Sequence, residues 1–255
     1  MQNLTDLCNK TILITGGCGA IGQVVVQALA EQGATVAVND IVSEQQAAAL
    51  LPESTKIAYF QADSGDPQKV NAMFERVIAR FGLPNVVCCH AGMVGAHPVE
   101  AYPLDEYDQL MNVNVRSSFV TAQIAVQHWI AAAVAGHLIF TSSWVQDVPW
   151  PEITPYTASK AALKAMMRGF ARELARKQIR ANAIAPGIVA VGLAKRQWDT
   201  DPQYQARASK AIPLEFLQPP ETIANAFVFL CSDMASYMTG AMLLVDGGCS
   251  LYPMD

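Results

Sequence analysis

The chain has 255 residues, of which 52% are hydrophobic and 15% are charged, and its formal net charge is −5. This composition fits a globular protein with a well-buried core, arranged as one large domain or two small ones. The acidic balance and the lack of a basic cluster argue against nucleic acid as a partner.

The hydrophobic pattern predicts strands that alternate with helices along the chain. Apolar runs without polar alternation predict strands at residues 11–15, 35–39, 57–61, 85–89, 137–141, 179–185 and 241–245. Helical spacing predicts helices at residues 21–32, 43–51, 66–81, 104–135 and 155–177. The longest of these helices should bend or break near residues 112–114. The alternation indicates βαβ units, so the predicted fold class is α/β: a single-domain, Rossmann-type, doubly wound, seven-stranded parallel sheet with helices on both faces.

No repeat, low-complexity segment or linker divides the sequence. Residues 1–255 are therefore predicted to form one dinucleotide-binding and catalytic domain. Residues 187–218 are the only long stretch without a regular pattern, and they are rich in charged and aromatic residues. Because a loop of that length inside a compact domain usually has a function, we expect this segment to be a substrate-binding lid.

Three features predict a cytoplasmic protein that does not enter a membrane. The six cysteines form no Cys-x-x-Cys motif, which favours buried, reduced thiols. Residues 1–10 lack the pattern of a signal peptide. The longest apolar stretch, residues 124–140, is interrupted by polar residues and fits a buried helix that runs into a strand.

A glycine-rich turn follows the first predicted strand. Residues 15–22 read Thr-Gly-Gly-Cys-Gly-Ala-Ile-Gly and lead directly into a predicted helix. Glycines at this place allow a tight turn and let backbone N–H groups approach a pyrophosphate at the helix N-terminus. The alternative is an ordinary strand-to-helix turn with no ligand. The turn therefore indicates dinucleotide binding only together with the features below.

Two carboxylates follow the next two predicted strands. Asp40 could accept hydrogen bonds from both ribose hydroxyls of NAD and would repel the extra phosphate of NADP. No Arg or Lys lies near it in the sequence, which favours NAD. Asp63 could accept a hydrogen bond from the adenine amino group. The alternatives are structural roles: Asp40 as a polar residue beside a helix, and Asp63 as a turn residue before Gly65.

His90, Ala91 and Gly92 follow the fourth predicted strand. The small residues Ala91 and Gly92 would let a cofactor pass close to the backbone. No second His, Cys or carboxylate lies at ligand spacing from His90, so it is interpreted as a structural histidine. We predict no metal site.

Tyr156 and Lys160 lie four residues apart and would share one face of a helix. A nearby ammonium stabilises a phenolate and lowers the pKa of the phenol, which makes the pair a candidate for proton transfer between an alcohol and a ketone. Ser143, just after the fifth predicted strand, could hold the substrate oxygen. Asn114, in the middle of a predicted helix, is either a buried polar residue that bends the helix or part of a water-linked proton path. A Tyr-x-x-x-Lys pair on its own is most often a surface contact.

Together, these motifs make the chain resemble the classical short-chain dehydrogenase/reductase family over essentially its whole length. The Asn-Ala-Ile-Ala-Pro-Gly segment at residues 182–187, Thr239-Gly240 and the Val-Asp-Gly-Gly segment at residues 245–248 also match that family. The resemblance implies a catalytic set of Asn114, Ser143, Tyr156 and Lys160. In this set Tyr156 is the general acid/base and Ser143 orients the carbonyl. Lys160 binds the nicotinamide ribose and lowers the pKa of Tyr156, and Asn114 holds a water that connects Lys160 to solvent.

The same resemblance implies a set of NAD-binding positions and a set of substrate-binding positions. The cofactor-binding positions are Gly16, Cys18, Gly19, Ala20, Ile21, Gly22, Asp40, Ile41, Asp63, Ser64, His90, Ala91, Gly92, Tyr156, Lys160, Pro186, Gly187 and Val189. The expected substrate-binding residues are Ser143, Gln146, Trp150, Tyr156 and Arg196.

Three positions depart from the family pattern. Ala20 replaces a glycine of the turn, Cys89-His90 replaces a pair of asparagines, and Val191 replaces a threonine that could bond the nicotinamide amide. None of these changes removes a proton-transfer group. They bear on cofactor affinity and not on the type of reaction.

The sequence therefore predicts an NAD-dependent oxidoreductase that interconverts a secondary alcohol and a ketone. Trp150 and nearby hydrogen-bonding side chains suggest a polar hydroxy compound, such as a sugar, polyol or sugar acid, and a place in carbohydrate metabolism. The alternatives are a reductase of 3-oxoacyl thioesters, which Asp40 disfavours because reductive biosynthesis usually draws on NADPH, and a non-catalytic NAD-binding regulator or scaffold. The family resemblance also implies a homotetramer or homodimer.

Overall fold

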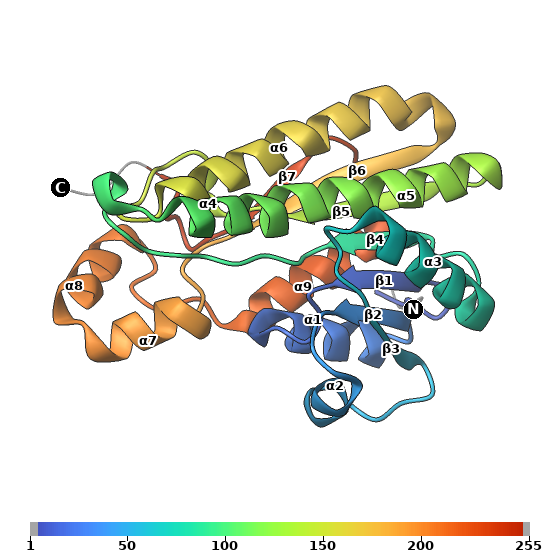
Figure 1. The fold of residues 1–255 in the computed structure, drawn as a ribbon, viewed down its shortest axis with the longest axis horizontal. Helices are drawn as coiled ribbons and strands as arrows, with labels where there is room; N and C mark the ends of the chain where they lie inside the picture. Colours follow the sequence, from blue (N-terminus) through green and yellow to red (C-terminus); the bar gives the residue numbers. More distant parts are fainter. Residues whose placement is uncertain (1–4, 252–255) are drawn as a thin grey trace.

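The centre of the molecule is a parallel sheet of seven strands, seen in a computed structural model that describes residues 5–251 (Figure 1). The strands are β1 (Thr11–Thr15), β2 (Thr35–Asp40), β3 (Ile57–Gln61), β4 (Val86–Cys89), β5 (Gly136–Thr141), β6 (Ile179–Pro186) and β7 (Met242–Val245). Their order across the sheet is β3-β2-β1-β4-β5-β6-β7, and every neighbouring pair is parallel. The chain thus winds outward from β1 in one direction and from β4 in the other, which confirms the predicted α/β, doubly wound fold.

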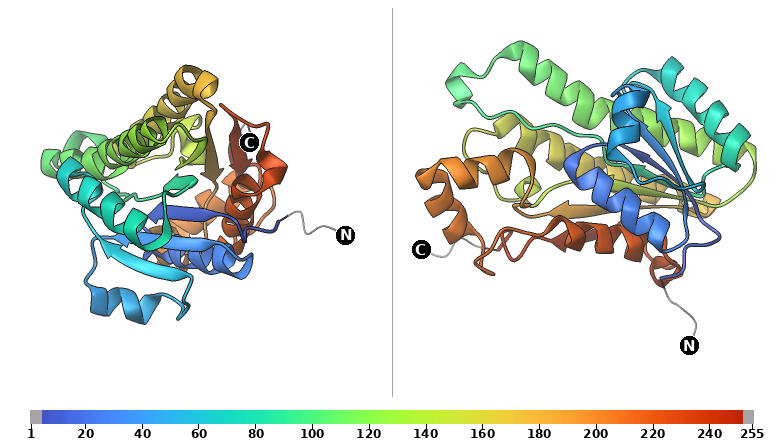
Figure 2. Two further views of the ribbon diagram at one scale, coloured as in Figure 1. Left: turned by 90° about the vertical axis from the view of Figure 1, so that its right-hand side faces the viewer. Right: turned by 90° about the horizontal axis from the view of Figure 1, so that it is seen from below.

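Helices cover both faces of this sheet (Figures 1 and 2). They are α1 (Ala20–Glu31), α2 (Glu44–Leu50), α3 (Pro67–Phe81), α4 (Leu104–Met111), α5 (Ser117–Ala131), α6 (Thr154–Leu174), α7 (Gly192–Thr200), α8 (Pro202–Ala211) and α9 (Pro220–Cys231). Helices α1 and α9 pack on one face, and α3, α5 and α6 pack on the other. None of the helices within residues 5–251 has both the length and the apolar character that crossing a membrane requires.

The strands are apolar throughout because both of their faces are buried. In β1, Ile12 and Ile14 join the core beneath α1 and α9, whereas Leu13 joins the core beneath α3, α5 and α6. All three side chains are fully buried. Alternate residues of a strand point to opposite faces, so a strand covered on both sides has no place for polar alternation.

Two local signals in the sequence set helix boundaries. The Asp66 side chain accepts hydrogen bonds from the N–H groups of Gln68 and Lys69, and Pro67 opens α3. The predicted break in the long helix is a π-helical turn, Asn112–Arg116, between α4 and α5. Such turns inside helices often accompany functional sites.

The segment 187–218 differs from the predicted irregular loop. It contains α7 and α8, which lie beyond the carboxyl ends of the strands (Figure 1). The Asp201 side chain accepts hydrogen bonds from the first turn of α8, and Pro202 opens that helix. This cap-then-proline signal is the same one that starts α3, and the sequence prediction missed it because these helices are short and mostly polar. Helix α9 was also not predicted.

Candidate functional site

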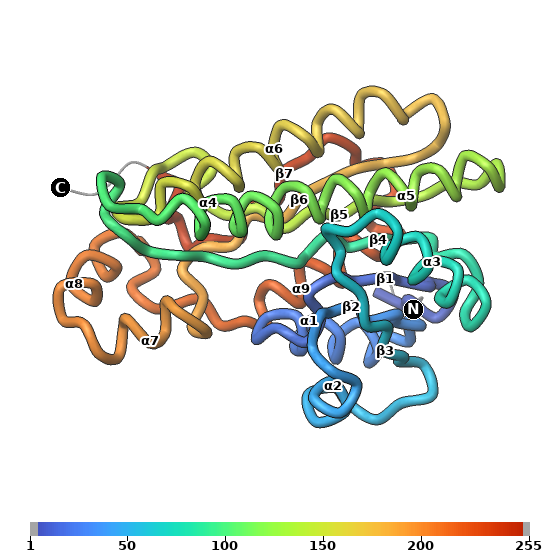
Figure 3. Tube along the Cα trace, in the orientation of Figure 1, coloured from blue at the N-terminus to red at the C-terminus, as the bar shows by residue number. Residues whose placement is uncertain are grey.

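A cavity of about 770 Å³ opens at the carboxyl ends of the strands. At one end it is lined by Asp40, the last residue of β2, and by Asp63, which follows β3, and at the other by Trp150 and by Tyr204 of α8. The chain leaving β4 runs toward α4 (Figure 3), and its residues 90–94 are part of the cavity lining. Ligands of open parallel sheets bind at this edge, next to the point where the strand order reverses.

The glycine-rich turn brings backbone close to backbone at the N-terminus of α1. Gly16 has a φ of +69°, and a Cβ there would lie 2.7 Å from the Cα of Ala91. Gly19 caps α1 without a side-chain hydrogen bond, so N–H groups of the first turn stay available for an anion. Gly16, Gly19, Ala20 and Ile21 all line the cavity. The Ala20 methyl group is exposed at the cavity and is accommodated as the first residue of α1.

Asp40 connects the glycine-rich turn to the end of β2. Its Oδ2 accepts a hydrogen bond of 3.0 Å from the N–H of Cys18, and its Oδ1 accepts one of 2.8 Å from the N–H of Ile41. Asp40 and Ile41 line the cavity, whereas Cys18 and Gly22 support the turn from behind. Burial and the Asp40 charge raise the pKa of the Cys18 thiol to about 11.

Asp63 and Ser64 line the same end of the cavity. The Oδ1 of Asp63 accepts a hydrogen bond of 2.9 Å from the N–H of Gly65, so this carboxylate has the turn-stabilising role considered as the alternative. Its other oxygen has no hydrogen bond among the described contacts of Asp63, and the side chain is exposed at the cavity edge. A structural role and a ligand-binding role are therefore compatible at this position.

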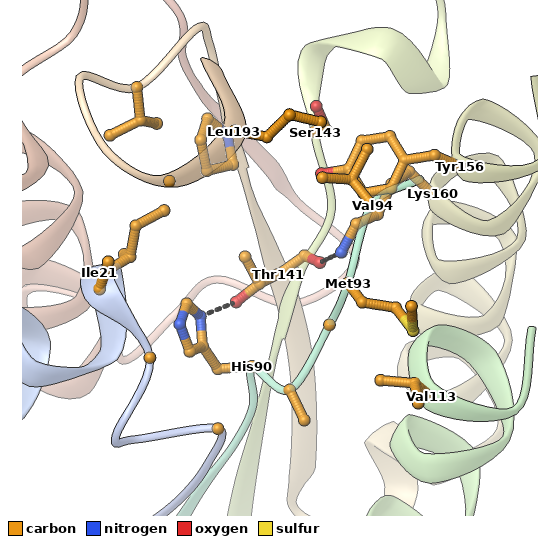
Figure 4. Close-up of a pocket in the computed structure, with 18 of the residues that line it drawn as sticks. Ile21, His90, Met93, Val94, Val113, Thr141, Ser143, Tyr156, Lys160 and Leu193 are labelled. Atoms are coloured by element: carbon orange, nitrogen blue, oxygen red, sulfur yellow. Dashed lines mark hydrogen bonds between the residues drawn. The ribbon is translucent and has the colours of Figure 1, made fainter. Parts of the chain in front are cut away.

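His90 lies between the two ends of the cavity. Its Nδ1 is 3.0 Å from Thr141 Oγ1, and its ring packs edge-on against Phe227, with the ring centroids 5.7 Å apart (Figure 4). Burial and then the charge of Lys160 lower the pKa of His90 to about 4, so the imidazole is neutral at pH 7. In residues 5–251 no group of three or more His, Cys, Asp and Glu side chains is arranged to hold a metal.

Ser143 and Tyr156 both line the cavity, and their hydroxyl groups lie on the same side of it, toward one another (Figure 4). Burial raises the pKa of Tyr156 to about 12, and the interaction with Ser143 opposes that shift. The sequence predicted that Lys160 would lower this pKa. The structure differs because the removal of the phenol from water has the larger effect, so the phenol is protonated at neutral pH.

Lys160 is buried one helical turn from Tyr156, with its Nζ 5.4 Å from the centroid of the tyrosine ring. The ammonium donates a hydrogen bond of 2.8 Å to the carbonyl oxygen of Thr141 at the end of β5. Burial lowers the pKa of Lys160 to about 8. Near neutral pH this amine is therefore easily deprotonated as well as charged, which suits it to proton transfer.

Asn114 is fully buried in the π-helical turn and does not line the cavity directly. Its Oδ1 accepts from the N–H of Met93 at 2.7 Å, and its Nδ2 donates to the carbonyl of Met93 and to Ser159 Oγ, both at 2.9 Å. The side chain thus connects the loop after β4 to α6, the helix that carries Tyr156 and Lys160. The predicted part of Asn114 in a water-linked path stays a prediction.

The expected substrate residues do not all reach the cavity. Trp150 lines it, as do Ser143 and Tyr156. Gln146 is buried, and its Oε1 accepts a hydrogen bond from Ser142 Oγ. Arg196 is exposed on α7 and is not among the residues that line the cavity.

Several residues that the sequence analysis did not select also belong to the site. Thr141 provides both the hydroxyl that meets His90 and the carbonyl that meets Lys160. Its place at the end of a predicted strand, two residues before Ser143, was the only available signal. Apolar residues on four separate segments also line the cavity: Met93, Val94, Val113, Ile153 and Leu193.

Comparisons with known proteins agree along nearly the whole chain. A family model described as Enoyl-(Acyl carrier protein) reductase matches residues 17–250. The 3beta-hydroxysteroid dehydrogenase 1 of Eggerthella lenta is 32% identical over 252 residues, which cover 97% of this chain and 96% of that protein. Glucose 1-dehydrogenase 2 of Bacillus subtilis is 32% identical over 257 residues, which cover 97% of each protein.

Two solved structures show the same fold. A short-chain type dehydrogenase/reductase from Mycobacterium marinum matches with a TM-score of 0.85 and 30% identity over 98% of both chains. A gluconate 5-dehydrogenase from Burkholderia cenocepacia, in complex with NADP and tartrate, matches with a TM-score of 0.89 and 28% identity over 97% of both chains.

Proposed function

This chain belongs to the short-chain dehydrogenase/reductase family and is an oxidoreductase acting on CH–OH groups, and we propose that it interconverts a secondary alcohol and a ketone with NAD. The observation that carries the proposal is that Ser143 and Tyr156 line the same cavity with their hydroxyl groups toward one another, with Lys160 on the next helical turn. An acid/base group, an orienting hydroxyl and a proton-accepting amine are the parts that this reaction needs from a protein.

Residues of this chain can donate and accept the proton that the reaction transfers. Tyr156 is protonated at neutral pH because burial raises its pKa, so it can give a proton to a ketone oxygen that Ser143 orients. In the reverse direction the phenolate takes the hydroxyl proton, and the charge of Lys160, 5.4 Å from the ring, favours that phenolate. A bound nicotinamide would accept or supply the hydride.

The choice of NAD over NADP rests on Asp40. Its carboxylate lies at the end of β2, where a dinucleotide's adenosine ribose would bind, and it is held toward the glycine-rich turn by Cys18. A 2′-phosphate would meet this negative charge, and the cavity has no cation at that end: among its described lining residues Lys160 is the one Lys or Arg. The gluconate 5-dehydrogenase that this chain resembles was solved in complex with NADP, so the choice needs a direct test.

Within the class, the relatives do not select a substrate, since their names refer to a steroid, glucose and gluconate. The expectation of a sugar, polyol or sugar acid, and of carbohydrate metabolism, stays a prediction. So does a reductase of 3-oxoacyl thioesters, for which the description of the matching family model gives some support. A cytoplasmic location and a homotetramer or homodimer are likewise predictions, and the assembly can be measured by light scattering.

The test compares Tyr156→Phe with the native protein. Purified protein with NAD should oxidise secondary alcohols, followed by the absorbance of the reduced cofactor, and Tyr156→Phe should lower kcat by about 10³-fold, in the range for loss of a general acid/base group. NAD binding, measured by calorimetry, should be retained. Turnover unchanged by the substitution would overturn the assigned role of Tyr156. A higher kcat/KM with NADP would overturn the choice of cofactor.

A further inference from the structure

The end of the cavity beside Tyr156 is made almost entirely of apolar side chains. Met93 and Val94 come from the loop after β4, Val113 from the π-helical turn and Leu193 from α7, and all four line the cavity that Tyr156 also lines (Figure 4). These three segments are separate in the sequence. Together they give an apolar surface to the cavity in which a substrate oxygen would reach Ser143 and Tyr156.

Aromatic rings form the outer wall of the same end. The Trp150 ring contacts Trp144 and Tyr204 edge-on, with centroid separations of 5.5 and 6.1 Å. The Arg207 guanidinium lies 4.9 Å from the Trp150 centroid on the side of α8. Trp144 and Tyr204 are each only 5% exposed, so this wall is held in place by packing. A rigid aromatic wall offers a large contact area to a ring at little entropic cost.

The end beside Tyr156 has no charge to offer a polar substrate. Among the described residues that line the cavity, the carboxylates are Asp40 and Asp63, both at the opposite end. Lys160 is already hydrogen-bonded to the Thr141 carbonyl. A substrate carboxylate would therefore lose its water without gaining a counter-ion, which is strongly unfavourable.

The basic residues of the segment 187–218 do not supply that charge. Lys195 is paired with Asp199 on the surface of α7, and Arg207 is stacked on Trp150. Arg196 and Lys210 are exposed and do not line the cavity. Neutral amide side chains such as Gln109, Asn112 and Gln197 also line the cavity, and they can bond additional polar groups of a substrate but cannot neutralise a carboxylate.

We infer that the substrate is an uncharged, largely apolar cyclic secondary alcohol, or the matching ketone, with its ring between the aromatic wall and the aliphatic side chains. This inference rests on the proposed function and selects the substrate class for it. The single reacting hydroxyl reaches Ser143 and Tyr156, and the rest of the molecule is recognised by burial of apolar surface, which is proportional to its area.

A homologous series tests the inference directly. With NAD in excess, KM is measured for cyclopentanol, cyclohexanol, cycloheptanol and decahydronaphthalen-2-ol, beside sorbitol, glucose and gluconate. Each buried methylene should lower KM roughly 4-fold until the cavity is full, as expected from about 0.8 kcal/mol per buried CH₂. The cyclic alcohols should have a kcat/KM at least about 100-fold above the polyols and the sugar acid.

Two variants on α7 provide a matched pair. Leu193→Gln places an amide in the apolar wall and should lower kcat/KM for the cyclic alcohols by roughly 10-fold. Arg196→Gln changes a residue of the same helix that does not line the cavity, and it should leave kcat/KM unchanged. Circular dichroism and Tm of both variants show whether either is misfolded, and the series on the native protein stands without them.

The outcomes separate the substrate class from the reaction itself. Polyols or gluconate turned over faster than the cyclic alcohols, or a KM that does not fall along the series, would overturn the inference and leave the proposed function intact. If no compound is oxidised, the proposed function fails, and the inference is then decided by binding. Calorimetric titration of the NAD-loaded protein should still show tighter binding of decahydronaphthalen-2-ol than of sorbitol, and equal or reversed affinities would overturn the inference.

Discussion

The two ends of the cavity are built in different ways. At the end formed by β1, β2 and β3, the surface is mostly backbone, and Gly16 and Asp40 act through close approach and hydrogen bonds to N–H groups. At the end formed by α7, α8 and the loop after β4, the surface is side chain, and it is apolar and aromatic. Ser143, Tyr156 and Lys160 lie where the two ends meet.

This difference explains why one end is constrained by geometry and the other by packing. A backbone cradle tolerates almost no added atom, because its carbonyl and amide groups cannot move without breaking the turn. An apolar wall tolerates substitution as long as its volume and polarity are kept. Adding a single methyl group should therefore disrupt the first end, whereas the second end should be disrupted by a change in the polarity of a side chain.

The largest expected effect is at the backbone end. A Cβ on Gly22 would lie 2.3 Å from the carbonyl oxygen of Gly16 and 2.8 Å from the Cα of Gly17, and neither backbone atom can give way. Gly22→Ala should lower the free energy of unfolding by more than about 3 kcal/mol, at the upper end for overpacking, and should abolish measurable NAD binding. Urea denaturation and calorimetry measure both quantities.

Gly19→Ala is the matched control in the same turn. Gly19 has a φ of −67°, and its nearest neighbour to an added Cβ is the Gly16 oxygen at 3.3 Å. An alanine there should change the free energy of unfolding by less than about 1 kcal/mol. Equal losses in the two variants would show that the turn responds to any methyl group and would remove the geometric basis of the comparison.

The next effect concerns Lys160, where the two ends meet. Its pKa is lowered by burial from 10.5 to about 8, so below pH 8 the folded protein holds a buried charge that the unfolded chain keeps in water. The buried charge lowers the free energy of unfolding of the native protein by its full amount below pH 8. This loss of stability disappears as the pH rises from 8 to 10.5, because in that range the unfolded state binds more protons than the folded state. Lys160→Met should thus be more stable than the native protein at pH 7, by on the order of 3 kcal/mol less the lost hydrogen bond.

The advantage of Lys160→Met should shrink as the pH approaches 10, which urea denaturation at several pH values would measure. Lys164→Met is the control, since Lys164 lies on the same helix but pairs with Asp147 near the surface. A stability difference that does not depend on pH in Lys160→Met would show that the amine is not a buried charge.

The third effect tests whether the charge of Asp40, at the backbone end, sets the cofactor preference. Asp40→Asn keeps a hydrogen-bond acceptor for Cys18 or Ile41 but removes the negative charge, so the ratio of kcat/KM for NADP to that for NAD should rise roughly 10- to 100-fold, as expected for hydrogen bonds to a charged group. Asp63→Asn, at the same edge of the sheet, should change the ratio by less than about 3-fold. An unchanged ratio in Asp40→Asn would mean that this carboxylate does not face the ribose.

The two ends also differ in how far the sequence predicted them. Burial on both faces forces continuous apolar runs, so β1 and β3 were predicted at their observed boundaries. Glycines and carboxylates that follow such runs lie at the strand ends by necessity, which is why Gly16, Asp40 and Asp63 were placed at the cavity edge.

The apolar end was not predicted because its residues have no local signature. Val94 and Leu193 look like any core residue in the sequence, and only the tertiary fold brings them beside Tyr156. For Gln146 and Arg196 the error was the opposite one. Their polar side chains suggested substrate binding, but Gln146 is buried and bonded to Ser142, and Arg196 is exposed on the surface. The pKa of Tyr156 was misjudged for a similar reason, because burial cannot be assessed from spacing alone.

The smallest effect concerns His90, which joins the two ends through Thr141. Burial lowers its pKa from 6.5 to about 4, so the unfolded chain binds more protons between these values and the native protein loses stability as the pH falls through that window. Asparagine can keep a hydrogen bond to Thr141 Oγ1 but does not titrate. His90→Asn should therefore lose less stability than the native protein on going from pH 7 to pH 6, by about 0.7 kcal/mol.

His90→Leu separates titration from the hydrogen bond to Thr141. Leucine removes both, so this variant should share the flatter pH dependence of His90→Asn but should also lower kcat/KM by several-fold, because Thr141 carries the carbonyl that holds Lys160 in place. Urea denaturation between pH 5 and pH 7 and turnover with NAD measure the two effects. If His90→Asn and His90→Leu turn over equally well, the contact with Thr141 does not position Lys160, and the two ends of the cavity act independently.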